Sequence, residues 1–214
     1  MLTVAITGSI GMGKSTAAKH FRACSIPVCD ADALVHELYA GPAVAPVEAA
    51  FPGTTHDGCV DRAKLSGALL GDADGWSRLE AIIHPMVRQA EADFLHTAFR
   101  AGAFAAAIEI PLLFETGADG LFDRTLVVSS PYEMQRQRVL ARQGMSEAKF
   151  ASILKRQLSD AEKRSRADFV VDTSGPLADT ADRLDEIVDE LKRDAAGLAA
   201  EETAYHRHWR AILL

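Results

Sequence analysis

The chain has 214 residues, and 48% of them are hydrophobic, so it can bury a sizeable core without metal or disulfide staples. Its net charge of −7 disfavours sequence-independent binding of nucleic acid, which needs basic surface. Three irregularly spaced cysteines, no long apolar run and no basic N-terminal leader favour a reduced, cytoplasmic protein without membrane association. No obligate protein partner is evident from the sequence.

The first forty residues alternate between strand and helix patterns. Leu2–Thr7 is apolar, rich in β-branched residues and followed by glycines, which predicts a buried parallel strand. We expect a helix over Lys14–Ala23, a second strand over residues 26–29 and a helix from Asp30 to about Tyr39.

The pattern then changes, because residues 41–101 contain turn-forming Gly and Pro followed by helical periodicity. Helices are predicted over residues 47–51, 62–70 and 76–99, and no strand is predicted in this segment. Residues 41–101 are therefore expected to form a helical insertion.

The second half returns to alternating strands and helices. Strands are predicted over residues 104–110, 124–128 and 169–172, and helices over residues 132–142, 147–157 and 177–193. Residues 1–40 and 102–195 should thus form an α/β core around a five-stranded parallel sheet, with ligands at the carboxyl ends of its strands. The tail, residues 196–214, carries no clear pattern.

One continuous motif points to phosphate binding. Residues 8–15, GSIGMGKS, fit G-x-x-x-x-G-K-[ST] without a gap, between an apolar strand and a helix. Glycines allow the main chain to turn its N–H groups towards phosphate oxygens, and the helix N-terminus adds a positive dipole end. An incidental glycine-rich turn is the alternative, and the intact motif in its context argues against it. The expected ATP-binding residues are Gly8, Gly11, Met12, Gly13, Lys14, Ser15 and Thr16, with Lys14 on the β- and γ-phosphates and Ser15 on Mg²⁺.

Four carboxylates are candidates for the rest of the site. Asp30 and Asp32 follow the second strand, and for this pair capping of the next helix and a role as the base for an acceptor hydroxyl are equally favoured. Glu109 ends the third strand, where it could contact Mg²⁺ or pair locally. Glu115 could orient a substrate or act as a cap.

Basic residues offer further candidates. Arg62, Lys64 and Arg88 could bind substrate phosphates, although solvated helix faces are their default, and His84 is more often a packed or solvated residue than a catalyst. Arg138 and Arg142 are four residues apart on one predicted helix. Together with the phosphate motif, this favours a lid over about residues 136–160 that brings arginines to the transferring phosphoryl group.

Taken together, these segments resemble the dephospho-coenzyme A kinase family. The matching segments, in order, are TGSIGMGKST, DADALVHEL, DRAKL, HPMVR, IPLLFE, RQRVLAR and RADFVVDTSG. The resemblance implies a three-layer P-loop kinase core with a helical acceptor-binding insertion and a helical lid. It also implies transfer of the ATP γ-phosphoryl group to the ribose 3′-hydroxyl of 3′-dephospho-coenzyme A, with Asp32 as base and Arg138 and Arg142 near ATP. His84, Arg62, Lys64, Arg88 and Glu115 would then belong to the acceptor side.

Three positions depart from the family pattern. Ser9 replaces a second glycine, Met12 replaces a small residue, and Thr173 stands where the family commonly has asparagine. Another small-molecule P-loop kinase, such as a nucleoside monophosphate or sugar-acid kinase, is the nearest alternative. A GTP-binding switch is disfavoured because the chain has no asparagine for the guanine-reading Asn-Lys-x-Asp motif. A scaffold without activity is disfavoured by the intact Lys14, Ser15 and Asp32.

Overall fold

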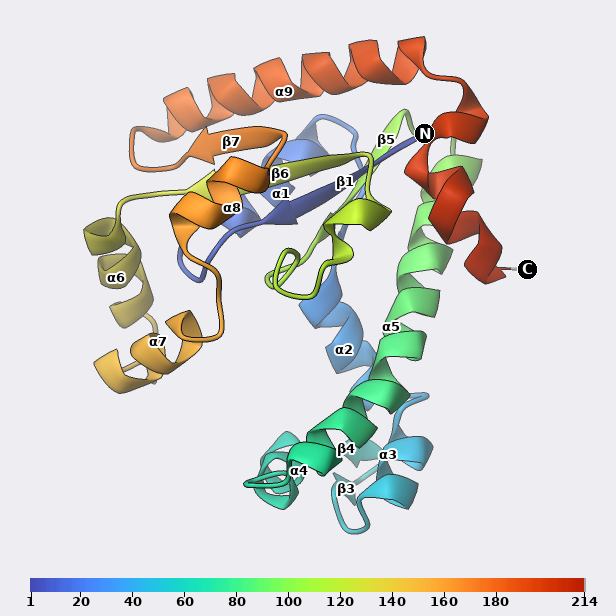
Figure 1. The fold of residues 1–214 in the computed structure, drawn as a ribbon, viewed down its shortest axis with the longest axis vertical. Helices are drawn as coiled ribbons and strands as arrows, with labels where there is room; N and C mark the ends of the chain where they lie inside the picture. The colour runs from blue at the N-terminus through green and yellow to red at the C-terminus, as the bar shows by residue number, and fades with distance from the viewer. Residues whose placement is uncertain (214) are drawn as a thin grey trace. The chain divides into compact units, whose positions relative to one another are not determined.

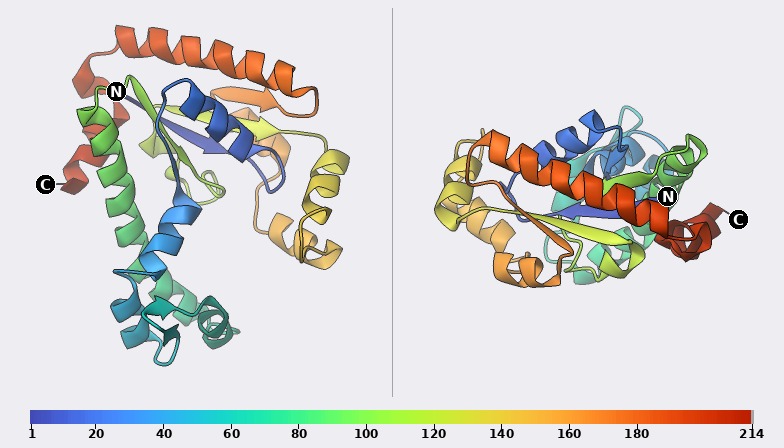
Figure 2. Two further views of the ribbon diagram at one scale, coloured as in Figure 1. Left: turned by 180° about the vertical axis from the view of Figure 1, so that it is seen from behind. Right: turned by 90° about the horizontal axis from the view of Figure 1, so that it is seen from above.

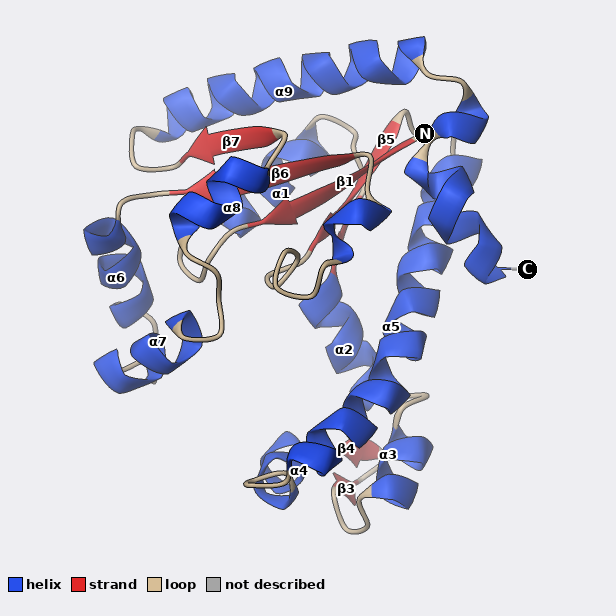
Figure 3. Ribbon diagram, in the orientation of Figure 1, coloured by secondary structure: helices blue, strands red, loops and turns tan. Residues whose placement is uncertain are grey.

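The computed structural model describes residues 1–213 and is drawn in Figure 1. Its residues form two compact units, one containing Met1–Cys29 and Leu95–Ile212 and the other containing Asp30–Phe94. Figure 3 separates helices from strands by colour.

A five-stranded sheet is the centre of the fold. Its strand order is β2 (Val28–Asp30), β5 (Ala105–Glu109), β1 (Leu2–Thr7), β6 (Arg124–Ser129) and β7 (Phe169–Asp172). Strand β1 runs parallel to β5 and β6, and β6 runs parallel to β7, which confirms the predicted parallel sheet. β2 starts two residues later than predicted, after a proline, which has no N–H to donate to the ladder.

Two helices, α1 (Lys14–Ala23) and α9 (Leu177–Gly197), pack together and cover one face of the sheet. Figure 2 shows them on the same side in the view from behind. The strands have an inward face of alternating residues, such as Val4 and Ile6, which is what a period of two requires. The largest core cluster joins that face to the helices through Phe21 and, from α9, Leu184, Ile187, Val188 and Leu191.

The first unit also contains three shorter helices after β6: α6 (Tyr132–Leu140), α7 (Glu147–Leu154) and α8 (Asp160–Arg166). Helices α6 and α7 end earlier than predicted, because the chain tightens into i→i+3 turns after each of them. The sequence analysis missed α8, although Ser159 and Glu162 form a capping box at its start.

The C-terminal tail packs on the first unit. It forms a π-helical turn at Tyr205–Trp209, flanked by 3₁₀ turns at Ala200–Glu202 and Arg210–Leu213. Trp209 is 1% exposed, and its indole N–H donates to the Leu121 carbonyl oxygen at 2.8 Å. The tail is thus part of the folded core, which its sequence pattern did not predict.

The second unit is mainly helical. It contains α2 (Ala31–Tyr39), α3 (Val44–Ala50), α4 (Arg62–Ala68) and most of α5 (Ala73–Arg100). These helices share a separate apolar cluster made by Leu38, Ala43, Val47, Phe51, Val60, Leu65, Leu69, Leu79 and Ile83. Over residues 1–213, no helix has both the length and the apolar character that crossing a bilayer requires.

The expectation of no strand in this segment is wrong. Strands β3 (Thr55–His56) and β4 (Cys59–Val60) form an antiparallel hairpin. Asp57 and Gly58, with φ of 48° and 75°, make the two-residue turn that favours such hairpins. Each strand has only two residues, too few to show the alternating pattern of a strand.

Candidate functional site

The loop between β1 and α1 is shaped by glycines that have no room for a side chain. Gly8, Gly11 and Gly13 have φ of 147°, 78° and 97°. A Cβ on Gly8 would lie 2.5 Å from the Val128 carbonyl oxygen, and one on Gly11 would lie 2.5 Å from Cγ2 of Val139. The phosphate motif therefore adopts backbone angles and close approaches that only glycine allows.

The residues that follow the loop open helix α1. Gly13 is the N-cap of α1 and has left-handed backbone angles. It makes no side-chain capping bond, and the first turn of the helix contains no acidic residue. Lys14 Nζ donates to the carbonyl oxygens of Gly8 at 2.8 Å and Ser9 at 3.5 Å, so its ammonium lies across the loop. Ser15 and Thr16 are exposed in the first turn. The arrangement combines a positive helix end with an ammonium group, which suits a polyphosphate.

Two glutamines from later segments of the chain hydrogen-bond to the backbone of the phosphate loop. Gln135 of α6, 3% exposed, donates its amide to the Ile10 carbonyl oxygen at 2.8 Å. Gln157 accepts from the Ile10 N–H at 3.2 Å. Neither glutamine was predicted from the sequence, because nothing local in their segments indicates a partner more than a hundred residues away.

Thr173 connects the loop to the arginine of α6. Its hydroxyl lies 2.9 Å from the Met12 carbonyl oxygen and 3.2 Å from that of Ser129. Arg138 donates to the Thr173 hydroxyl at 3.0 Å and to its carbonyl oxygen at 2.6 Å. The structure thus brings Arg138 to the phosphate motif through Thr173.

Arg142 is placed differently from the prediction. Helix α6 ends at Leu140, so Arg142 does not share a helical face with Arg138. It is exposed in the turn that leads to Gly144. Their spacing of four therefore does not bring the two guanidinium groups together on α6.

A cavity of about 420 Å³ adjoins the loop. Its lining includes Ser9 and Met12 of the loop, Tyr132 and Gln135 of α6, and Asp172 at the end of β7. Hydrogen bonds from the Ser174 side chain and N–H hold the pKa of Asp172 below its ordinary value. The cavity is thus bordered by an ionised carboxylate and by the helices expected to form a lid.

Two glutamates lie at or beyond the end of β5. Glu109 is the last residue of the strand, is 8% exposed and stands in register with Ile6 of β1, just before the phosphate motif. Glu115, only 12% exposed, accepts from Lys163 Nζ and from the Leu158 N–H, both at 2.8 Å. Lys163 is fully buried and also donates to the Pro111 carbonyl oxygen at 3.2 Å.

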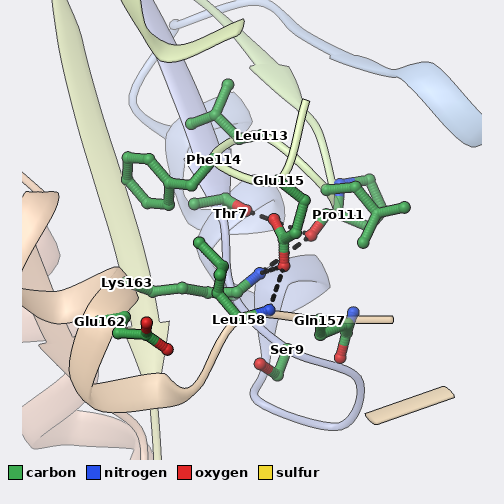
Figure 4. A network of polar contacts seen from close by, with 12 residues as sticks. Thr7, Ser9, Pro111, Leu113, Phe114, Glu115, Gln157, Leu158, Glu162 and Lys163 are labelled. Atoms are coloured by element: carbon green, nitrogen blue, oxygen red, sulfur yellow. Dashed lines mark hydrogen bonds and ion pairs between the residues drawn. The ribbon is translucent and has the colours of Figure 1, made fainter. Parts of the chain in front are cut away.

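Figure 4 shows how this buried pair connects three segments. The loop after β5 supplies Glu115 and Pro111, the α7–α8 connection supplies Leu158, and α8 supplies Lys163. The carboxylate that was expected on the acceptor side is therefore held by a buried ion pair inside the first unit. Its second oxygen, Oε2, is buried and has no hydrogen-bond partner among the described residues.

In the second unit, the two aspartates have different positions. The Asp30 side chain caps α2 by accepting from the N–H groups of Asp32 at 2.9 Å and Ala33 at 3.3 Å. Asp32 is exposed in the first turn of the helix. Of the pair, Asp30 is therefore the cap, and the Asp32 carboxylate is accessible.

A basic group lies against the first turn of α2, in the same unit. His36 Nδ1 lies 2.7 Å from the Asp32 carbonyl oxygen, and its Nε2 contacts the guanidinium of Arg62. His36 was not among the predicted site residues, although it lies four residues after Asp32 on a predicted helix. The structure therefore links Arg62 to the turn that carries Asp32.

The remaining candidates of this unit have other surroundings. Lys64 is exposed and pairs loosely with Asp61 at 3.9 Å. His84 is exposed in the middle of α5. Arg88 is half-buried and pairs with Glu91 at 3.5 Å, while burial raises the pKa of Glu91 to about 7 despite the opposing charge of Arg88.

Comparison with known proteins agrees with the motifs. A family model described as dephospho-CoA kinase matches residues 2–179. A dephospho-CoA kinase of Mesorhizobium japonicum is 55% identical over 193 residues, which cover 90% of this chain and 98% of the relative. A crystal structure of a Thermus thermophilus protein matches with a TM-score of 0.78 and 35% identity, over 89% of this chain and 97% of that one.

A second solved structure supports the fold. The dephospho-CoA kinase from Campylobacter jejuni matches with a TM-score of 0.68 and 23% identity, over 90% of this chain and 98% of that one. The family model covers the sheet, the phosphate motif and helices α1 to α8. The chain therefore belongs to the dephospho-CoA kinase family.

Proposed function

We propose that this chain transfers the γ-phosphoryl group of ATP to the ribose 3′-hydroxyl of 3′-dephospho-coenzyme A, giving ADP and coenzyme A. The observation that carries the proposal is the phosphate loop, whose glycines admit no side chain and whose helix begins with an ammonium group over the loop. Membership of the dephospho-CoA kinase family supports the acceptor.

The loop residues fit a bound triphosphate by the chemistry of their donors. N–H groups of Gly8, Gly11 and Gly13 would face the phosphate oxygens. The N–H groups of Met12 and Thr16 now donate to the carbonyl oxygens of Ser9 and Gly13, and would join them only by leaving these partners. Lys14 would likewise leave its carbonyl partners for the β- and γ-phosphates. Mg²⁺ would be held by the Ser15 hydroxyl, with Glu109 in its outer shell. When bound, the cation neutralises charge on the phosphates.

Asp32 is the proposed base. Its exposed carboxylate would accept the proton of the 3′-hydroxyl as the 3′-oxygen forms a bond to the γ-phosphorus. The bond from the γ-phosphorus to the bridging oxygen of ADP breaks in the same displacement. Asp30 is the weaker candidate, because its Oδ1 already accepts the two N–H groups that cap α2.

The insertion, residues 41–101, is proposed to bind the acceptor. Arg62 and Lys64 of α4 and His84 and Arg88 of α5 offer cationic or hydrogen-bonding groups for its phosphates. Arg62 is the strongest of these candidates, because His36 connects it to the backbone of Asp32. We propose that Glu115 is a positioning residue, whose ion pair with Lys163 holds the region next to the phosphate loop in place.

Helices α6 and α7 are proposed as the lid. Arg138 already contacts Thr173 beside the phosphate loop, and Arg142 is exposed in the next turn. Closure would bring their charge to the transferring phosphoryl group and exclude water from it.

The test is an ADP-release assay with 3′-dephospho-coenzyme A as acceptor. Shikimate, gluconate and AMP serve as comparison acceptors for other small-molecule P-loop kinases. We expect turnover with 3′-dephospho-coenzyme A only. Faster turnover with one of the comparison acceptors would overturn the proposed substrate.

Variants test the roles of the two charged residues. Lys14→Ala should abolish measurable turnover, whereas Lys19→Ala, an exposed lysine of the same helix, should leave it unchanged. Asp32→Asn should lower kcat by about 10²–10⁴-fold, the usual contribution of a general base, while ATP still binds. Glu37→Gln, which neutralises another acidic residue of α2, is the matched control. Full activity of Asp32→Asn would refute the assigned base.

A further inference from the structure

Away from the phosphate loop, three side chains with metal-binding atoms meet where α1 packs on α9. His20 and Cys24 come from the last turn and the C-cap of α1, and Asp185 comes from α9. His20 Nε2 lies 2.8 Å from Asp185 Oδ1, and Cys24 Sγ lies 3.8 Å from the same oxygen. One ligand atom from each of the three residues lies within 4.8 Å of the other two.

The geometry is close to that of a tetrahedral metal site. A tetrahedral ion with bonds of 2.0–2.3 Å holds its ligand atoms about 3.3–3.6 Å apart. The observed separations bracket this range, so small side-chain rotations would suffice. His20 and Cys24 are four residues apart, the spacing that puts two side chains on one helix face.

The type of ligand selects the type of metal. One imidazole nitrogen, one thiolate and one carboxylate oxygen suit Zn²⁺ or a similar late divalent ion, whereas Mg²⁺ prefers oxygen ligands alone. The Asp185 side chain is 62% exposed and that of His20 is 20% exposed, so a water molecule could take the fourth position.

We propose that His20, Cys24 and Asp185 form a binding site for Zn²⁺ or a related late divalent ion, separate from the nucleotide site. Binding of the ion displaces the Cys24 thiol proton to the solvent, and the His20 ring keeps its proton on Nδ1 while Nε2 binds the ion. The metal joins α1, the helix that opens with the phosphate motif, to α9.

The test uses the full chain after treatment with a chelator, without nucleotide. Co²⁺ should give the thiolate-to-metal absorption band in the near ultraviolet, and Zn²⁺ should abolish that band by competition. Zn²⁺ at about a hundred times its dissociation constant should raise Tm by about 5–10 °C.

Variants decide whether these residues form the site. Cys24→Ser and His20→Gln should each lose the Co²⁺ band and most of the Tm shift, with circular dichroism confirming that they fold. Cys59→Ser, which changes an exposed cysteine outside the cluster, should behave like the parent chain. Absence of the band in the parent chain, or an unchanged band in Cys24→Ser, would overturn the proposal.

Discussion

The buried pair of Lys163 and Glu115 gives the sharpest stability prediction. The Lys163 side chain is 0% exposed and that of Glu115 is 12% exposed, so water cannot replace a lost partner. Lys163→Met leaves the Glu115 carboxylate with the Leu158 N–H as its remaining hydrogen-bond donor. Breaking one side of a buried pair typically costs about 3–5 kcal/mol, so we expect Tm to fall by about 6–20 °C.

A double-mutant cycle separates the charge interaction from packing. Glu115→Gln should also cost about 3 kcal/mol, because it leaves the Lys163 ammonium buried beside the Pro111 carbonyl oxygen and a neutral amide. The double variant, Glu115→Gln with Lys163→Met, should be more stable than either single variant, because neither charge remains.

Urea unfolding at pH 7 gives the free energy of unfolding and a thermal melt gives Tm, both followed by circular dichroism. Lys149→Met is the matched control, because Lys149 is an exposed lysine of α7 that donates to the Gly144 carbonyl oxygen at 2.8 Å. It should change the free energy of unfolding by less than about 0.5 kcal/mol. The reasoning is refuted if Lys163→Met is as mild as this control, or if the two single effects add in the double variant.

Three further predictions concern the loop, a buried acid and the tail. Gly11→Ala should weaken ATP binding by at least about tenfold in a nucleotide titration. Its Cβ would lie 2.5 Å from Val139 Cγ2, and Gly11 has a φ of 78°, which alanine rarely adopts. Gly120→Ala, at a position with open space for a Cβ, is the control. Burial raises the pKa of Glu91 to about 7 from 4.5, so its folded form binds more protons than its unfolded form between these values, and stability falls as the pH rises from about 4.5 to 7. Glu91→Gln should therefore stabilise the chain by about 2–3 kcal/mol at pH 8 and hardly at all at pH 4.5 in urea unfolding; equal effects at both pH values would contradict the pKa. Trp209→Ala should lower the free energy of unfolding by about 3–5 kcal/mol, because it empties a buried site and leaves the Leu121 carbonyl oxygen without its indole donor. A loss below about 1 kcal/mol would show that the packing of the tail adds little to the stability of the fold.

The sequence was sufficient to predict the sheet and the phosphate loop because their signals are local. The apolar run Leu2–Thr7 by itself predicts a strand, and the contiguous motif after it by itself predicts a phosphate loop. The hairpin around Asp57 and Gly58 also had a local signal, the favoured turn pair, but its strands are too short for a pattern.

Helix α8 and the support of the loop could not be found in the same way. Residues 160–166 read as DAEKRSR, without apolar periodicity, because the one buried side chain of the helix is Lys163. The contacts of Gln135, Gln157 and Thr173 with the loop join residues 125 or more positions apart, so no window of sequence contains both partners. Asp30 and Asp32 could be told apart only when the capping geometry was visible.

The contacts of Thr173 suggest what kind of side chain this position accepts. Its hydroxyl oxygen both donates its single proton, shared between the Met12 and Ser129 carbonyl oxygens, and accepts from Arg138. An asparagine amide also carries a donor and an acceptor on one short side chain. A Thr173→Asn substitution would thus keep a donor and an acceptor where the ends of β7, α6 and the phosphate loop meet, whereas Thr173→Val would keep the shape and lose both functions.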